Sequence, residues 1–270
     1  MIEQADLLNN IAAGIILALI IAIFSLKAKF LSRSGAAATF ILAAGIYGFG
    51  GWKWTLPILA FFLSSSLLSK LRKNKNQNVD LYFDKTGVRD AAQVFANGGL
   101  SLLLVSLNLF YPNDVFYYLN VAVIAGVCAD TWSTEIGTMK KFRTYNICNF
   151  RSIEQGRSGG ISLPGTSAAL AGALFIAFTG ALWITDGLLV YFFIIILSGF
   201  LGSAFDSLLG ATVQLQYICS VCGKITERKN HCGKGTHYSK GIKILNNDLV
   251  NFIAGLSSGI FSFILYEIIY

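Results

Sequence analysis

Apolar stretches of about the length that crosses a lipid bilayer recur along the whole chain, and they constrain the fold more than any other feature. A helix needs about 20 predominantly apolar residues to span the hydrocarbon core. Only 13% of the residues are charged, far below the soluble average of about 25%. Stretches that approach the spanning length cover residues 11–26, 35–51, 54–69, 91–111, 115–137, 166–184, 187–208 and 249–269. The sequence therefore predicts an all-α fold, a polytopic transmembrane bundle. It has seven or eight spans, because the second and third stretches are short and could form one re-entrant pair.

The basic residues predict how this bundle lies in the membrane. All but one of the 21 Lys and Arg residues fall in four segments, which follow the first, third, fifth and seventh spans if there are eight; the exception is Lys53. Basic loops stay on the cytoplasmic side. We therefore expect both termini outside and treat the net charge of +7 as a topology signal. Nucleic-acid binding is not expected, because the charge sits in loops between spans.

Four of the hydrophobic stretches begin or end in runs of acids, amides and glycines. A carboxylate at the middle of a span costs about 2.5–3.5 kcal/mol, so such residues usually mark a function. All four runs fall at the predicted cytoplasmic ends of spans. The economical explanation is one polar cavity shared by these ends, at the cytoplasmic face of a single domain that covers residues 1–270.

The first run places polar groups on one side of a helix. Asp90, Gln93 and Asn97 are spaced i, i+3 and i+7, which is one helical face. Arg89 precedes them, and its planar guanidinium suits two oxygens of a phosphate. The alternative is an Arg89–Asp90 pair that caps the helix, with the amides packing between spans.

Two further runs share the same short sequence pattern. Gly126-x-x-x-Asp130-Thr131 and Gly202-x-x-x-Asp206-Ser207 both read glycine, three residues, aspartate and a hydroxyl residue. An internal repeat would bring the two acids together across an interface. Two converging carboxylates suit Mg²⁺, which takes one or two of them together with substrate phosphates. Glu135 falls on a different helical face from Asp130 and either reaches a second wall of the cavity or anchors a neighbouring span.

The fourth run and a separate glycine-rich turn suit oxygen-rich ligands. The glycine-rich segment 156–166 leads directly into a span, and backbone N–H groups at such a turn hold phosphates. Thr166 could equally be a plain helix N-cap. Asn247, Asp248 and Asn251 open the last span; an N-cap would explain either of the first two but not Asn251. No Walker A sequence is present, which excludes a soluble P-loop fold.

The segment 214–248 is the longest polar stretch and carries a metal-like pattern. Two thiols at C-x₂-C spacing and further Cys or His residues downstream can form a structural Zn²⁺ site. The candidate ligands are Cys219, Cys222, His231, Cys232 and His237. A redox pair or unliganded cysteines remain as alternatives, and in each case we expect a structural part of the protein.

Five ordered motifs across residues 10–268 resemble an integral membrane family that was long catalogued as a domain of unknown function. This family includes transmembrane-protein-19-like proteins. Its plant and cyanobacterial members include phytyl-phosphate kinase. More distantly, the chain is similar to CTP-dependent polyprenol kinases. The motifs are Arg89-Asp90-Ala91-Ala92-Gln93-Val94-x-Ala96-Asn97-Gly98-Gly99, Ala129-Asp130-Thr131-Trp132-x-x-Glu135-x-Gly137, Gly159-Gly160-Ile161-Ser162-x-x-Gly165-Thr166, Asp206-Ser207-x-x-Gly210-Ala211-Thr212-x-Gln214 and Asn247-Asp248-x-Val250-Asn251.

The resemblance implies a Mg²⁺-dependent phosphotransferase that moves a phosphoryl group from a nucleoside triphosphate such as CTP to an isoprenyl monophosphate. The implied catalytic residues are Asp130, Asp206, Asp90 and Arg89. The implied Mg²⁺ ligands are Asp130, Glu135, Asp206 and Asp248. The implied substrate- and nucleotide-binding residues are Gln93, Asn97, Gly98, Gly159, Gly160, Ser162, Gly165, Thr166, Asn247 and Asn251. The glycine turn lacks the Lys that polyprenol kinases carry there, so Arg157 or Lys140 would supply that charge.

Other functions fit parts of the sequence. A polyprenol or phytol kinase, or a lipid cytidylyltransferase, would use the same kind of site. A lipid-phosphate or ion transporter would also contain glycine-interrupted spans and buried acids, and a non-catalytic assembly factor would use the Cys/His segment for docking. The expected partners are a nucleoside triphosphate, an isoprenyl phosphate and membrane lipids, and the sequence leaves a homo-oligomer open.

Overall fold

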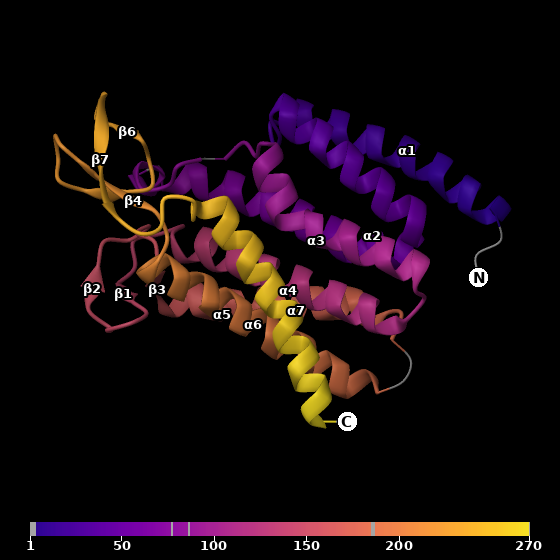
Figure 1. Ribbon diagram of the computed structural model, residues 1–270. Coiled ribbons are helices and arrows are strands. Elements are labelled where there is room, and N and C mark those ends of the chain that lie inside the picture. Colours follow the sequence, from indigo (N-terminus) through magenta and orange to yellow (C-terminus); the bar gives the residue numbers. More distant parts are fainter. Residues whose placement is uncertain (1–3, 77, 86, 185–186, 270) are drawn as a thin grey trace.

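The computed structural model describes residues 4–76, 78–85, 87–184 and 187–269, and it confirms a mostly helical bundle (Figure 1). Within these residues, seven helices are long and apolar enough to cross a membrane. They are α1 (Gln4–Lys27), α2 (Arg33–Lys75), α3 (Ala91–Phe110), α4 (Asp114–Gly137), α5 (Leu163–Ala181), α6 (Leu188–Thr212) and α7 (Asn247–Ile269).

Helix α2 contains the second and third apolar stretches as two arms of a hairpin. The arms meet at Gly51, whose φ of 60° and ψ of −154° are not helical. Glycine takes such a positive φ without steric cost. Ser32, just before the first arm, donates its backbone N–H to Arg89 O at 3.0 Å, while Arg89 Nη1 donates to Ser66 Oγ in the second arm at 3.4 Å. Both arms thus return to one residue, and the described residues contain eight α-helical segments when the arms of α2 are counted separately.

The two ends of the bundle differ in character. We call the end that carries the β-strands the polar end (Figure 1); α1 begins and α7 finishes at the opposite, far end. Lys53, the one basic residue outside the four basic segments, lies beside the α2 hairpin turn at the far end, where it pairs with Asp114 at 3.2 Å. The predicted separation of charge between the two ends is therefore present, while the membrane side that each end faces stays a prediction.

Helix α4 forms the centre of the bundle and packs against α2, α3, α5, α6 and α7. Small residues let these helices approach closely. Gly126 of α4 and Gly202 of α6 both face Ser258 of α7, and a Cβ on either glycine would overlap the Ser258 hydroxyl. Each glycine lies one turn before the acid of its repeated motif, so this packing brings Asp130 and Asp206 to the same place. The internal repeat as a whole stays a prediction.

Two small antiparallel sheets, which the sequence did not predict, cover the polar end. The first has the order β2-β1-β3 and the second β5-β4-β7-β6. The elements are a 3₁₀ helix η1 (Asn78–Leu81) and strands β1 (Thr144–Asn146), β2 (Ser152–Ile153), β3 (Gly160–Ile161), β4 (Gln216–Cys219), β5 (Ile225–Thr226), β6 (Asn230–His231) and β7 (Lys234–Lys240).

The second sheet is tied to the segment between α2 and α3. Thr226 Oγ1 donates to Leu81 O at 2.9 Å, and the Glu227 N–H donates to Tyr82 O at 2.9 Å. Arg228 Nε donates to Phe83 O at 2.8 Å. The Cys/His segment therefore packs on the bundle at the polar end, where it can contribute side chains to a site.

Candidate active site

A pocket opens at the polar end, with about 1450 Å³ of empty space that is partly continuous with solvent. Residues from α2, α3, α4, α6, α7 and both sheet-bearing segments line it, and most of them are polar. The predicted site residues that line this pocket are Arg89, Gln93, Asn97, Asp130, Glu135, Gly159, Gly160, Ser162, Gly165, Asp206, Asn247, Asp248 and Asn251. Asp90, Gly98 and Thr166 do not line it.

Asp130 and Asp206 supply carboxylates that no basic residue neutralises. They project from α4 and α6 into the same pocket, and neither forms an ion pair with any described residue. Asn251 of α7, with its amide nitrogen toward the acceptors, donates to Asp206 Oδ2 at 3.1 Å and to Asn247 O at 3.3 Å. Oxygen atoms from two acids and neighbouring amides are a donor set that suits Mg²⁺.

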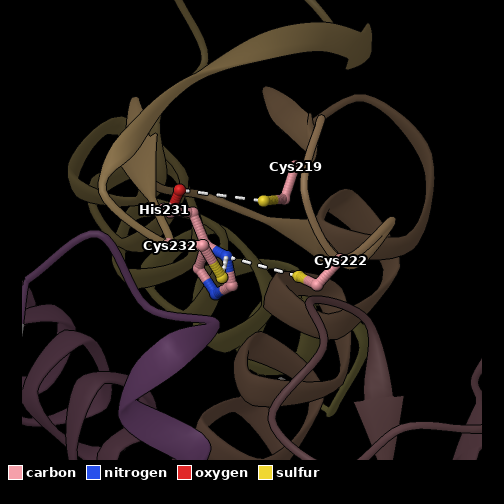
Figure 2. A group of neighbouring side chains, drawn as sticks. All are labelled: Cys219, Cys222, His231 and Cys232. Atoms are coloured by element: carbon pink, nitrogen blue, oxygen red, sulfur yellow. Dashed lines mark hydrogen bonds between the residues drawn. The ribbon is translucent and has the colours of Figure 1, made fainter.

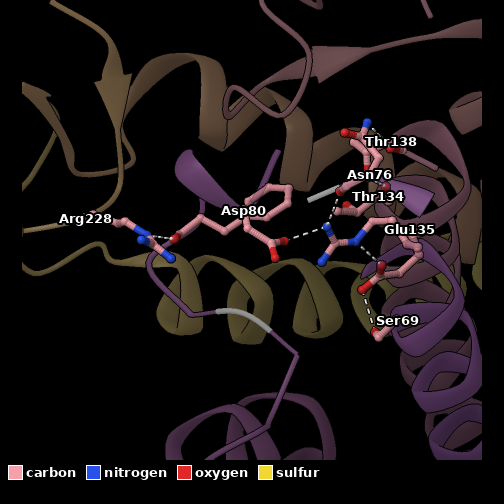
Figure 3. Close-up of polar contacts among 9 residues, drawn as sticks. Ser69, Asn76, Asp80, Thr134, Glu135, Thr138 and Arg228 are labelled. Carbon is pink, nitrogen blue, oxygen red and sulfur yellow. Dashed lines mark hydrogen bonds and ion pairs between the residues drawn. The ribbon is translucent and has the colours of Figure 1, made fainter. Parts of the chain in front are cut away.

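Glu135 is engaged in a different way (Figure 3). Its two carboxylate oxygens accept from Ser69 Oγ at 2.5 Å and from Arg72 Nε at 2.6 Å. Of the two alternatives that the sequence left open, the structure favours the anchor: Glu135 ties α4 to α2. Coordination of Mg²⁺ by Glu135 would compete with both of these bonds.

Arg72 lines the polar pocket, although in the sequence it stands out only as one member of a basic segment. Its side chain is almost fully buried, and its Nη1 lies 2.6 Å from Asp80 Oδ1, so two acids neutralise it. A buried charge of this kind persists only when it is paired and hydrogen-bonded. The sequence signal was weak, because Arg72 lies among Lys70, Lys73 and Lys75, which are equally basic.

Asp90 stabilises the start of α3. Its side chain accepts from the Gln93 N–H at 3.0 Å, and the Gln93 side chain accepts from the Asp90 N–H at 3.3 Å, which is a capping box. The Arg89–Asp90 ion pair of the alternative interpretation is absent from the described residues; Lys85 instead bridges Asp90 at 2.8 Å and Asp248 at 2.5 Å. This geometry supports the capping alternative for Asp90 over a catalytic role.

Arg89 has no acid partner among the described residues. Its guanidinium lies 5.7 Å from the ring centre of Phe61 and 6.0 Å from that of Phe62. Burial lowers the pKa of Arg89 below its ordinary value, and a guanidinium remains charged at neutral pH. A partly buried cation without a carboxylate partner is suited to binding an anion that arrives from outside.

A second, apolar pocket of about 630 Å³ adjoins the polar one between α1, α2 and α3. The two pockets share Arg89, Gln93 and Asn97 as lining residues. The predicted site residue Gly98 lies in this second pocket, where it faces Leu42 and Ile58 of the two α2 arms. An amphiphile could therefore place its polar head and its apolar chain on either side of Arg89.

The glycine-rich turn is placed by a close approach to α6. Gly159 has a φ of 79°, and a Cβ there would overlap the backbone of Ala211. Ser162, and not Thr166, caps α5, because its Oγ accepts from the Gly165 N–H at 3.3 Å. Thr166 is exposed, so neither its predicted binding role nor its predicted capping role finds support in the geometry.

Two further expectations are resolved at the polar end. Arg157, but not Lys140, lines the pocket and is available for the charge that the glycine turn lacks.

The cap of α7 is Asn246, whose Oδ1 accepts from the Leu249 N–H at 3.0 Å. The alternative of an N-cap at Asn247 or Asp248 is therefore not supported, and both residues line the pocket.

Glu227 is a pocket residue that the sequence analysis missed. It follows β5, and its Oε1 accepts from Ser158 Oγ and from Gln214 Nε2, both at 2.7 Å. Burial raises the pKa of Glu227 to about 7, and the charge of Asp84 adds to this shift. No spacing signal could have found it, because the docking of the second sheet alone brings it to the pocket.

The raised pKa of Glu227 predicts a pH-dependent stability. In the unfolded chain the carboxyl group titrates near its ordinary pKa of 4.5, whereas in the folded protein it holds its proton up to about pH 7. The unfolded state therefore binds fewer protons in this window, and the free energy of unfolding should fall as the pH rises from about 4.5 to 7. In Glu227→Gln this decrease should be smaller, measured by thermal unfolding in detergent without Mg²⁺. The exposed Glu154→Gln is the control and should retain the wild-type slope.

The Cys/His segment brings four of its five candidate ligands together (Figure 2). Ligand atoms of Cys219, Cys222, His231 and Cys232 all lie within 4.8 Å of one another. His237 is outside this group, in β7, where it pairs with Ile218 of β4. Its predicted role as a Zn²⁺ ligand is therefore not supported by the fold.

The sequence profile of the integral membrane protein family DUF92 matches residues 16–259, which is most of the chain. The chain belongs to this family. No solved structure matched it.

Named relatives of this DUF92 chain occur in plants and archaea. Protein PGR of Arabidopsis thaliana is 31% identical over 265 residues, 89% of this chain and 91% of the relative. The uncharacterized membrane protein MJ0933 of Methanocaldococcus jannaschii is 27% identical over 267 residues, 98% of both chains. Protein VTE6, chloroplastic, of Arabidopsis thaliana is 24% identical over 229 residues, 83% of this chain and 61% of the relative. The similarity to PGR and MJ0933 extends over almost their whole lengths.

Proposed function

We propose that this DUF92 chain is a membrane-embedded kinase that transfers a phosphoryl group from a nucleoside triphosphate to an isoprenyl monophosphate, which yields the diphosphate. The observation that carries the proposal is the junction of the two pockets. Unpaired Asp130 and Asp206 lie in the polar pocket, and unpaired Arg89 lies where that pocket meets the apolar one. A substrate with a phosphate head and a hydrocarbon tail matches this division.

The polar pocket contains the groups that phosphoryl transfer needs. Catalysis of this reaction is mostly positioning and neutralisation of charge on the transferred group. In the proposal, Asp130 and Asp206 hold Mg²⁺, with Asn251 orienting Asp206. Mg²⁺ held by these two carboxylates would supply positive charge to neutralise the phosphates. Arg157 and the N–H groups of the glycine turn bind the triphosphate.

Arg89 and its two neighbours on α3 would receive the acceptor. The guanidinium of Arg89 binds the lipid monophosphate through two N–H groups, and Gln93 and Asn97 donate amide hydrogens beside it. The hydrocarbon chain then lies in the apolar pocket between the α2 arms and α3, which also opens toward lipid. In this arrangement the phosphate stays in the polar pocket, and its charge is not transferred to an apolar environment.

The proposed orientation follows from the loops. The polar end carries the basic segments, so it faces the cytoplasm by the positive-inside pattern. A water-soluble nucleoside triphosphate reaches the pocket from that side, while the lipid enters laterally from the bilayer.

The test is an assay of the purified full chain in detergent. It supplies Mg²⁺, CTP or ATP in parallel, and phytyl, geranylgeranyl or farnesyl monophosphate, and reads lipid products by mass spectrometry. Isoprenyl diphosphate is the expected product. Free alcohols in a parallel arm would reveal a polyprenol kinase, and a cytidylated lipid would reveal a cytidylyltransferase. No lipid product from folded protein would overturn the proposal and lead to transport assays in vesicles.

The apolar pocket predicts a chain-length effect. Ala43 lines this pocket, and Ala43→Phe should fill space that a long chain needs. Losing the burial of about two methylenes costs roughly 1.6 kcal/mol, so kcat/KM for geranylgeranyl phosphate should fall about 15-fold. Isopentenyl phosphate, whose chain is far shorter and buries much less apolar surface, should react as with wild type. Ile41→Phe, at a side chain 53% exposed on the same helix, is the matched control and should change neither value.

A further inference from the structure

We propose that Cys219, Cys222, Cys232 and His231 form a Zn²⁺ site, and that this ion holds the second sheet in the shape that delivers Glu227 to the polar pocket. The inference is independent of the proposed kinase activity, because it concerns a separate group of side chains and can be tested without substrate. Zn²⁺ sites with three thiolates and one imidazole are a common structural type.

The distances within the group fit tetrahedral coordination. Zn²⁺ bonds of about 2.3 Å to sulfur and 2.0–2.1 Å to nitrogen place neighbouring sulfur and nitrogen ligands about 3.5 Å apart. His231 Nδ1 lies 3.5 Å from Cys222 Sγ and 3.2 Å from Cys232 Sγ (Figure 2). The ring is buried, and its Nε2 has no hydrogen-bond partner among the described residues, so hydrogen bonding alone does not explain its position.

The backbone around the group is shaped to present sulfur atoms. Cys219 ends β4, and Cys222 lies in the tight turn that follows, which Gly223 closes with a φ of 71° and an N–H donated to Cys219 O at 2.9 Å. The Val221 N–H donates to Cys219 Sγ at 3.4 Å, which favours a thiolate. Cys232 itself has a φ of 53°, a left-handed conformation that is strained for a residue with a side chain. Bonding of its sulfur to a metal would compensate for that strain.

The site would close the loop between β5 and β6, whose hydrogen bonds run to β7 and to the segment between α2 and α3, while no backbone hydrogen bond among the described residues directly joins the two ends that carry the cysteines. Strands β5 and β6 have two residues each, and the chain between them carries Glu227 and Arg228. Glu227 accepts from Ser158 and Gln214, and Arg228 donates to Phe83 O, so both contacts reach outside the sheet. Cross-linking Cys219 and Cys222 to His231 and Cys232 fixes the two ends of this loop. The ion would therefore position Glu227 without touching the polar pocket.

The experiment measures metal in the full chain. Protein purified in detergent, incubated with Zn²⁺ and desalted is expected to contain one equivalent of zinc by inductively coupled plasma mass spectrometry. Cys222→Ser and Cys232→Ser should each lose most of it. Cys148→Ser is the matched control, because Cys148 is a free, exposed thiol outside the group; this variant and His237→Ala should retain the full equivalent. Cobalt in place of zinc should give the visible absorption bands of a tetrahedral thiolate site.

Limited proteolysis keeps the proposal testable if the serine variants fold poorly. Lys224, Arg228 and Lys229 lie in or beside the loop, so trypsin should cut wild-type protein there only after an organomercurial has released the metal. Zinc-free wild type after incubation, or equal zinc loss in Cys148→Ser, would overturn the proposal. A Cys219–Cys222 disulfide found by mass spectrometry in freshly purified protein, with no metal bound, would overturn it in favour of a redox pair.

Discussion

Asp130→Asn should lower the rate of isoprenyl diphosphate formation by about 10²–10³-fold, the size of effect seen when one electrostatic group is removed from an active site. The substitution removes one of two carboxylates proposed to hold Mg²⁺ but preserves the shape of the side chain. A weaker Mg²⁺ site should also raise the Mg²⁺ concentration that gives half-maximal rate. The measurement is a Mg²⁺ titration of the assay with CTP and geranylgeranyl phosphate.

Stability separates this effect from misfolding. Asp130 has no ion-pair partner among the described residues, so the neutral amide removes a desolvated charge and should leave the unfolding temperature unchanged or raise it. Asp206→Asn should behave in the same way. Asp114→Asn is the matched control, because it makes the same substitution in the same helix as Asp130→Asn. Asp114 lies at the far end of the bundle, where it pairs with Lys53 at the surface, so this variant should keep the wild-type rate. Full activity of Asp130→Asn would refute the Mg²⁺ role.

Arg72→Ala should be the most destabilising single substitution at the polar end. Its guanidinium is buried between Glu135 and Asp80, and removing one partner of a buried ion pair typically costs about 3–5 kcal/mol. At roughly 2–4 °C per kcal/mol for a chain of similar size, the thermal midpoint should fall by about 6–20 °C. Circular dichroism or a thiol-reactive dye in detergent would measure this shift.

Substitution of an exposed lysine in the same helix and a double variant test why Arg72→Ala lowers the stability. Lys70→Ala, on an exposed position of the same helix, should shift the midpoint by no more than about 2 °C. Arg72→Met combined with Glu135→Gln should recover part of the lost stability, because Glu135 then no longer holds an unpaired charge; the recovery is incomplete, since Asp80 still lacks its partner. Equal midpoints for Arg72→Ala and Lys70→Ala would show that the buried pair contributes nothing to the free energy of unfolding.

Most of the site could be predicted from sequence because its signals are local. Carboxylates and amides beside apolar spans are costly, so Asp130, Asp206, Asn247 and Asn251 were recognisable without knowledge of the fold. The spacing that puts Asp90, Gln93 and Asn97 on one face depends only on helical periodicity. Spacing alone could not distinguish a pocket residue from a cap, and only the capping box seen in the structure favours the capping alternative for Asp90.

The partners of these residues could not be predicted, since they come from segments far apart in the chain. Arg72 meets Glu135 across 63 positions, and Lys85 meets Asp248 across 163. Both pairings depend on how helices and loops pack at the polar end. Glu227 reaches the pocket only because the second sheet docks beside η1.

The sequence by itself determined that this protein is a bundle of membrane-spanning helices with its costly polar residues gathered at one end, because hydropathy, charge distribution and helical periodicity are properties of contiguous residues. The tertiary structure alone decided which charges are free to bind ligands. Glu135 and Asp130 lie on the same helix, yet Glu135 is neutralised by Arg72 while Asp130 faces the pocket unpaired. The physical reason is that neutralisation requires an opposite charge within a few ångströms, and the return of the chain at Gly51 supplies Arg72 to Glu135 and none to Asp130.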